Sequence, residues 1–122
     1  MELKELYQEI ILEHGKNPRN KGKCEGYTNE AKAHNPLCGD KVHIYLKLNN
    51  EKLIEDLSFE GEGCAISLAS ASILTEITKG KDLSFIKKIS GDFLNMIKNK
   101  TKITLNSLTE DQVTTITSLS GV

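Results

Sequence analysis

Residues 41–60 read KVHIYLKLNNEKLIEDLSFE, and this stretch decides the fold. Over 41–48, apolar residues alternate with polar ones, which is the pattern of a β-strand whose two faces differ. The pair Asn49-Asn50 favours a tight turn, because asparagine tolerates positive φ better than most residues. A second strand is expected over about 53–60. The stretch therefore predicts an antiparallel hairpin or meander.

Helical patterns lie on both sides of this hairpin in the chain. Apolar residues recur at helical spacing in four segments: about 3–14, 64–79, 82 or 84 to 98, and from 109 onward. Gly15 and Pro18 predict the end of the first of these helices. Residues 27–33 are a candidate for one more short strand. We therefore expect an α+β fold, with a small antiparallel sheet of about three strands and helices packed on one face.

Size and composition narrow the class of protein. A chain of 122 residues with 38% hydrophobic and 27% charged residues is large enough for one domain with an aliphatic core. Its net charge of −1 provides no electrostatic basis for binding nucleic acid or an anionic membrane. No apolar run has the form of a signal peptide or the length of a membrane span, so we expect a cytoplasmic protein. The three cysteines include no CxxC pair, which argues against a disulfide framework or a zinc ribbon.

The segment HNPLCGD, residues 34–40, places a thiol and a carboxylate two residues apart. Pro36 favours extended geometry before it, and Gly39 permits a sharp turn between Cys38 and Asp40. In an extended backbone, residues i and i+2 project to the same side, so one metal ion can meet both groups. Taken alone, the motif is more typical of a buried cysteine beside a turn aspartate than of a metal site.

Cys64 strengthens the metal hypothesis. It follows Gly61-Glu62-Gly63 at the predicted start of a helix, where backbone N–H groups and the helix dipole lower the pKa of a thiol. The predicted hairpin returns the chain so that Cys64 comes near Cys38 and Asp40. Two thiolates and a carboxylate suit zinc, or iron in a cluster.

Three segments together resemble the U-type iron–sulfur cluster assembly proteins, which include IscU, the N-terminal domain of NifU, and SufU. They are LYQEIILEHGKNPRNKG (6–22), NPLCGD (35–40) and GEGCAISLASAS (61–72). The resemblance implies that Cys38, Asp40 and Cys64 bind zinc or a nascent [2Fe–2S] cluster. It also implies that the protein receives persulfide sulfur from a SufS-like cysteine desulfurase and serves downstream cluster carriers or apo-proteins.

Within that resemblance, we assign Cys38 as the sulfur acceptor, since it lies on a turn that can be presented to a partner. Asp40 would orient or labilise the metal, and Cys64 would anchor it. A scaffold that assembles a cluster and a zinc-dependent sulfur acceptor are both compatible with these roles. The segment from about 98 to 122 is similar to an insertion of SufU-type members, which favours the sulfur acceptor.

The sequence departs from the family in one respect. Family members have a third ligand cysteine downstream, whereas no cysteine follows Cys64 here. We interpret residues 1–122 as a single U-type domain that lacks its C-terminal segment and helix, with a lost ligand as the alternative. The corresponding alternative function is a non-catalytic binding or regulatory module with an incomplete metal site.

Four other residues receive predictions of their own. Cys24, in the polar loop GKCEG, is expected to be an exposed thiol without a role. His14 is expected to cap and pack the first helix. His34, four residues before the first motif cysteine, is the candidate substitute ligand. His43 is expected on the solvated face of its strand, together with Tyr45.

Overall fold

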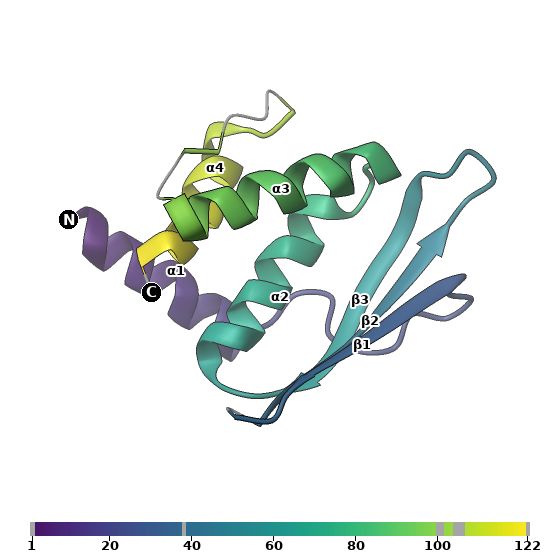
Figure 1. Cartoon of the computed structure of the whole chain (residues 1–122), viewed down its shortest axis with the longest axis horizontal. Coiled ribbons are helices and arrows are strands. Elements are labelled where there is room, and N and C mark those ends of the chain that lie inside the picture. Colours follow the sequence, from purple (N-terminus) through teal and green to yellow (C-terminus); the bar gives the residue numbers. More distant parts are fainter. Residues whose placement is uncertain (1, 38, 100–101, 104–106, 122) are drawn as a thin grey trace.

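The computed structural model describes residues 2–37, 39–99, 102–103 and 107–121. It has an α+β fold in which helices lie on one face of a three-stranded antiparallel sheet (Figure 1), which confirms the expected class. In chain order the elements are α1 (Leu3–Lys16), β1 (Asn29–Asn35), β2 (Asp40–Leu48), β3 (Ile54–Glu62), α2 (Ala65–Thr78), α3 (Leu83–Asn99), α4 (Glu110–Thr117) and the short 3-10 helix η1 (Ser118–Gly121). Within the described part of the chain, no helix is both long and apolar enough to cross a membrane.

The sheet has the order β1-β2-β3, with both pairs antiparallel. Asn35 pairs with Asp40 across the first turn, and Lys41 pairs with Glu62. The end of β1, the start of β2 and the end of β3 therefore meet at one end of the sheet. The predicted strand at 27–33 lies two residues further along the chain, at Asn29–Asn35. This end of the sheet carries the residues of the candidate site.

The core lies mainly between the helices, and α2 connects it to the sheet. Phe59 of β3 is fully buried on the face toward α2, as is Ile54 at the start of the strand. Each fully buried side chain of this size contributes about 1.5–3 kcal/mol through the hydrophobic effect. The buried interhelical cluster consists of Ile11, Ala69, Ile73, Ile77, Phe85, Ile89, Met96, Ile103, Ile116 and Leu119. The core is thus largely aliphatic, as the composition indicated.

Two of the later helices begin where the sequence predicted. Asp82 precedes α3, and its Oδ1 accepts a hydrogen bond of 2.9 Å from the N–H of Phe85. Thr109 and Gln112 form a reciprocal capping box at the start of α4. In both cases a side chain satisfies backbone N–H groups that have no partner within the helix.

The first helix continues past its predicted end. Gly15 lies inside α1, which runs to Lys16, so the prediction of a stop at Gly15 is wrong. A Cβ atom at Gly15 would lie 3.1 Å from both the Cβ and the carbonyl oxygen of Ala65. The glycine is there because α1 crosses the start of α2 at close range, which is a tertiary requirement rather than a local one.

The loop between α1 and β1 runs along the free edge of β3 and then packs on the second face of the sheet, where the ring centroids of Tyr27 and Tyr45 are 5.2 Å apart. Its backbone pairs with β3, through hydrogen bonds of 2.7 Å from Gly22 N–H to Phe59 O and 2.9 Å from Phe59 N–H to Asn20 O. Cys24, which belongs to this loop, is only 4% exposed, so the prediction of an exposed thiol is wrong. Burial, and then a hydrogen bond to Asp56, raise the pKa of Cys24. The loop is polar in sequence, but it packs on the sheet and buries this thiol.

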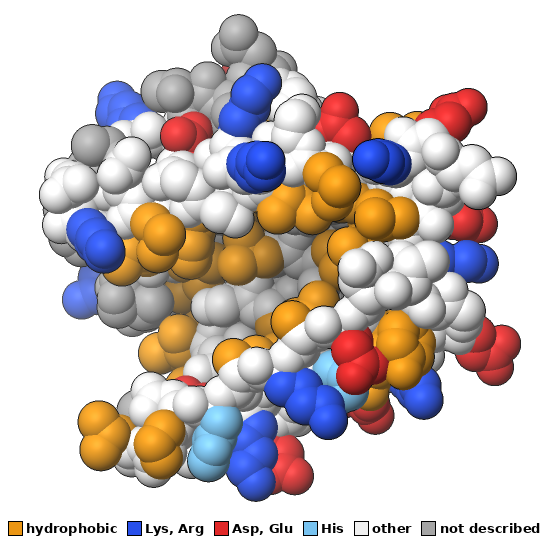
Figure 2. Space-filling model, turned by 45° about the vertical axis from the view of Figure 1, so that its right-hand side comes forward, with side chains coloured by type: hydrophobic (Ala, Val, Ile, Leu, Met, Phe, Trp, Pro, Cys, Tyr) orange, Lys and Arg blue, Asp and Glu red, His pale blue; other side chains and the backbone are white. Residues whose placement is uncertain are grey.

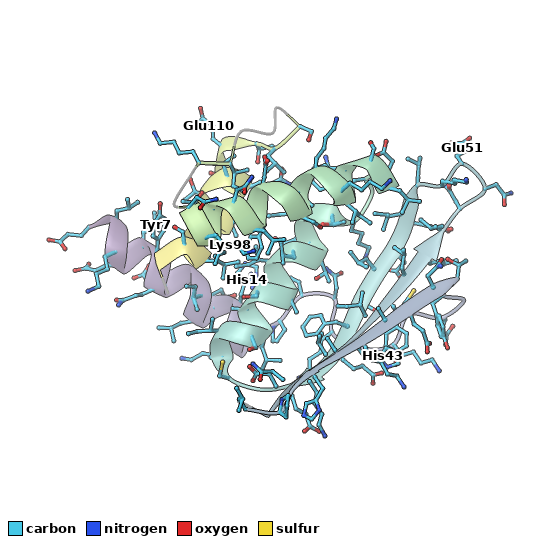
Figure 3. The ribbon with its side chains drawn as sticks, in the orientation of Figure 1. Tyr7, His14, His43, Glu51, Lys98 and Glu110 are labelled. Atoms are coloured by element: carbon cyan, nitrogen blue, oxygen red, sulfur yellow. The ribbon has the colours of Figure 1, made fainter. Side chains whose placement is uncertain are left out.

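The same loop affects the face of β2 that carries His43 and Tyr45. The alternation of apolar and polar residues had predicted that this face is exposed to solvent. Tyr45 is buried, and its hydroxyl donates a hydrogen bond to Glu60, which raises the pKa of Tyr45 to about 12. His43 stacks on this ring, with ring centroids 4.1 Å apart, on the side of the sheet away from the helices (Figure 3). His43 is therefore half-buried rather than a free surface residue.

A buried histidine connects α1 to α2. His14 lies between the two helices (Figure 3), and its Nδ1 is 2.7 Å from Oγ of Ser72. Ser72 Oγ also accepts a hydrogen bond of 2.8 Å from the N–H of Arg19. The serine proton is thus free to go to a neutral Nδ1. Burial, and then the nearby charge of Arg19, lower the pKa of His14.

We predict that the free energy of unfolding falls as the pH drops below about 6.5, the ordinary histidine value. The pKa of His14 is lowered in the folded state, so the unfolded chain binds more protons in this range. The contribution of His14 to the free energy of unfolding is then fully present above that pH and is lost as the pH falls below it. Urea unfolding at several pH values, in chelator, measures the effect.

His14→Gln should flatten this pH dependence, whereas His34→Gln, at an exposed position, should leave it intact. An unchanged profile in His14→Gln would contradict the assignment.

Candidate metal centre

The turn between β1 and β2 is held by Asn35. Its carbonyl oxygen accepts a hydrogen bond of 2.8 Å from the N–H of Gly39, and its Oδ1 accepts one of 3.1 Å from the N–H of Leu37. Gly39 has φ of +72°, a conformation that side chains other than glycine rarely adopt. The turn therefore delivers Asp40 to the first position of β2 in a defined place.

Cys64 arrives from the other side, at the end of β3. It is the N-cap residue of α2, and its side chain is exposed. Hydrogen bonds from the hydroxyl and the backbone N–H of Ser67 lower the pKa of the Cys64 thiol. A thiol that is accessible and more acidic than usual is suited to metal binding or sulfur chemistry.

Asp40 and Cys64 meet at the start of α2. Asp40 Oδ1 accepts a hydrogen bond of 3.2 Å from the N–H of Cys64, and Oδ2 accepts one of 2.8 Å from Oγ of Ser67. The same Ser67 Oγ is 3.5 Å from the sulfur of Cys64. A carboxylate from β2 thus satisfies the first turn of α2, which has no acidic residue of its own.

Gly63 makes this approach possible. A Cβ atom at this position would lie 2.2 Å from Oδ1 of Asp40, which is less than any non-bonded contact allows. Its φ of +155° also favours glycine. The glycine before the cysteine thus provides the space that the carboxylate fills.

The structure places the predicted site residues as follows. Asp40 and Cys64 are adjacent, and Cys38 lies outside the described residues, next to Gly39 in the chain. Among the residues that the structure describes, no three His, Cys, Asp or Glu side chains form a group that could hold a metal. The ligand roles of all three residues stay predictions.

The strand register argues against His34 as the substitute ligand. It pairs with Lys41, whereas its neighbour Asn35 pairs with Asp40. Because successive residues of a strand point to opposite faces, His34 lies on the face opposite to Asp40.

The sequence analysis missed Ser67. Its position in the sequence could have indicated a role at the site. It lies three residues after Cys64, where a side chain can reach the N-cap of a helix.

The chemistry of these groups fits a thiophilic divalent metal. An acidic, exposed thiol and a carboxylate are both zinc ligands, and iron accepts the same donors. The carboxylate has about four lone-pair sites, of which its two hydrogen bonds use two, so it retains capacity for a metal. With the thiol of Cys38 the donor set would be two sulfurs and one oxygen, with one position open.

A cleft extends from this centre between the sheet and α2. It has a volume of about 520 Å³, with Asp40 and Ser67 at one end and apolar walls that include Val42, Ile44 and Leu74. Figure 2 shows hydrophobic side chains gathered along this hollow between the strands and the helices. The centre is therefore open to solvent and to partners along one side.

The fold is that of a small α+β domain found in NifU-like proteins. Residues 6–116 match the family model of the NifU-like N terminal domain, and the chain belongs to this family. The resemblance to U-type proteins is thereby confirmed.

Relatives with assigned names fall into two groups. The chain is 43% identical over 95 residues to the zinc-dependent sulfurtransferase SufU of Bacillus subtilis, covering 78% of this chain and 63% of that protein. It is 39% identical over 87 residues to the iron–sulfur cluster assembly scaffold protein IscU 1 of Archaeoglobus fulgidus, covering 71% and 56%. The chain thus spans less than two thirds of the length of these relatives.

Solved structures share the fold over a larger part of their length. A putative iron–sulfur cluster assembly scaffold protein for the SUF system from Fervidobacterium islandicum superposes with a TM-score of 0.77 at 28% identity, covering 94% of this chain and 82% of that one. A NifU-like N-terminal protein from Brucella abortus has a TM-score of 0.79 at 21% identity, which shows the fold alone; 97% of this chain and 78% of that one are covered.

We predict that Gly63→Ala destabilises the fold by about 1–3 kcal/mol, the usual range for overpacking, because the new methyl group displaces the Asp40 carboxylate. Gly80→Ala is the matched control, since Gly80 also has positive φ, +87°, but has no atom within 4 Å of a Cβ. Urea unfolding measures both variants. Equal losses would show that backbone strain alone, not the carboxylate, requires glycine at 63.

We also predict that iodoacetamide labels Cys64 well before Cys24 in the folded, metal-free protein. The first thiol is exposed with a lowered pKa, and the second is buried with a raised pKa. Peptide mapping by mass spectrometry measures each rate. Unfolding in urea should bring the two rates together; equal rates in the folded protein would contradict the structure.

Proposed function

We propose that this protein accepts persulfide sulfur from a cysteine desulfurase during iron–sulfur cluster assembly, with Cys38 as the acceptor. In this proposal Cys38, Asp40 and Cys64 hold zinc. The observation that supports it most directly is the contact between Asp40, two residues after Cys38 in the chain, and the start of α2 at Cys64. The acceptor of the sulfur would in turn be a downstream cluster carrier or apo-protein, in the cytoplasm, where thiols stay reduced.

The exposure of the residues next to Cys38 in the chain supports transfer between proteins. Leu37, the residue before Cys38, is 95% exposed at the turn. Persulfide transfer needs two sulfur atoms from two proteins in contact, so the acceptor has to lie where a partner can reach it. Leu37 and Gly39, on either side of Cys38 in the chain, are exposed at the end of the sheet, as this requirement predicts.

The transfer itself is an exchange at sulfur. The thiolate of Cys38 attacks the terminal sulfur of the desulfurase persulfide, a new S–S bond forms, and the old one breaks. The desulfurase cysteine leaves as a thiolate and takes up a proton, so no external oxidant or reductant is needed. When bound, zinc keeps its cysteine ligands as thiolates at neutral pH. Asp40 is the harder donor of the set and would release the metal more readily than sulfur does.

A cluster scaffold is the second candidate. The IscU relatives carry that name, and the same three residues would then hold a nascent [2Fe–2S] cluster as cargo. A non-catalytic binding or regulatory module with an incomplete metal site is the remaining alternative. The greater identity to the zinc-dependent SufU, 43%, favours the zinc-bound sulfur acceptor.

Metal analysis and a sulfur-transfer assay test this proposal. We expect about one zinc per chain after anaerobic purification, and ³⁵S transfer from a cysteine desulfurase that Cys38→Ser abolishes. Cys24→Ser is the matched control, since Cys24 is buried away from the centre and should not affect transfer. Transfer at wild-type level to Cys38→Ser would refute the acceptor. A reconstituted visible iron–sulfur spectrum without bound zinc would favour the scaffold, and neither metal nor sulfur would favour the binding module.

A further inference from the structure

The hydroxyl of Ser67 contacts both of the described ligand candidates, Asp40 and Cys64. Its hydroxyl oxygen is 2.8 Å from Oδ2 of Asp40 and 3.5 Å from Sγ of Cys64. A hydroxyl has one proton to donate and lone pairs with which to accept. The single hydroxyl proton can go to one acceptor at a time, either the carboxylate oxygen at 2.8 Å or the sulfur at 3.5 Å. The hydroxyl thus lies between the two groups and contacts both.

The other serines of α2 are used differently. Ser70 Oγ donates to the carbonyl oxygen of Ile66, 2.9 Å away in its own helix. Ser72 is buried and contacts His14 and Arg19. Of the three serines in this helix, Ser67 is the one whose hydroxyl contacts the carboxylate from β2.

Serine at position 67 suits the contact with Asp40 better than the residue types that commonly occupy this place in a helix. Ser67 is the third residue of α2, where an acidic side chain commonly closes a capping box. An acid there would repel the Asp40 carboxylate, and alanine would favour the helix but provide no donor. Serine costs some helix propensity and supplies the one hydrogen bond that fixes Oδ2. Its partly buried side chain limits competition from water.

We propose that Ser67 is a positioning residue for the metal: its hydroxyl holds the Asp40 carboxylate and the Cys64 sulfur at the spacing that one ion requires. This inference rests on the proposed function, because it presupposes that these residues bind zinc. Partners that orient metal ligands in this way typically change metal affinity about 10–100-fold when removed. Ser67 does not itself touch the reacting sulfur.

Zinc affinity of four proteins tests the proposal: wild type, Ser67→Ala, Ser67→Thr and Ser70→Ala. Competition with a chromophoric chelator gives the dissociation constant. We expect Ser67→Ala to bind zinc about 10–100-fold more weakly, Ser67→Thr to recover part of the loss, and Ser70→Ala to stay within about twofold. The Co²⁺-substituted proteins provide a second measurement, in which Ser67→Ala should alter the thiolate-to-cobalt absorption band and Ser70→Ala should not.

Each other result overturns the proposal in a distinguishable way. Wild-type affinity in Ser67→Ala, with weakened binding in Asp40→Ala, would remove Ser67 and leave the proposed function intact. Equal weakening in Ser67→Ala and Ser70→Ala would indicate a general effect on the helix. Failure of the wild-type protein to bind zinc or cobalt would overturn both the zinc site and the role of Ser67.

Discussion

The contact between the Asp40 carboxylate and the first turn of α2 is the interaction on which the candidate centre depends. It joins the sheet to the helix at the point where the chain leaves β3, through the N–H of Cys64 and the hydroxyl of Ser67. The carboxylate accepts a hydrogen bond from the N–H of Cys64, which the helix cannot satisfy itself, and its charge complements the positive end of the helix dipole. The same placement sets a candidate metal ligand beside an exposed thiol whose pKa is lowered, so one contact would serve both stability and the proposed chemistry.

The rest of the fold keeps that contact in place. The far side of α2 is fixed to α1, by the buried His14–Ser72 hydrogen bond and by the close approach of Gly15 to Ala65. The near side has a glycine at 63, which leaves room for the carboxylate. The helix is therefore held from both sides, while Cys64 itself stays exposed to solvent. This combination of a rigid support and an accessible sulfur suits a centre that exchanges its cargo with other proteins.

Local sequence patterns were sufficient for part of this arrangement. Alternation over 41–48 predicted β2, and helical spacing after Cys64 predicted α2 with the cysteine at its start. The errors all concern contacts between distant segments. Gly15 lies where two helices cross at close range, Cys24 is buried because its polar loop packs on the sheet, and the pairing register shows on which face His34 lies. Periodicity describes the faces of one element, and it carries no information on what covers them.

Zinc K-edge X-ray absorption of the zinc-loaded protein tests the central claim, that Cys38, Asp40 and Cys64 bind one ion. The account predicts two sulfur ligands at about 2.3 Å and the remaining oxygen or nitrogen ligands near 2.0–2.2 Å. Replacing Cys64 by serine should remove one sulfur from this shell, and replacing Cys24 should remove none. A shell without sulfur, or one that is unchanged in Cys64→Ser, would contradict the account.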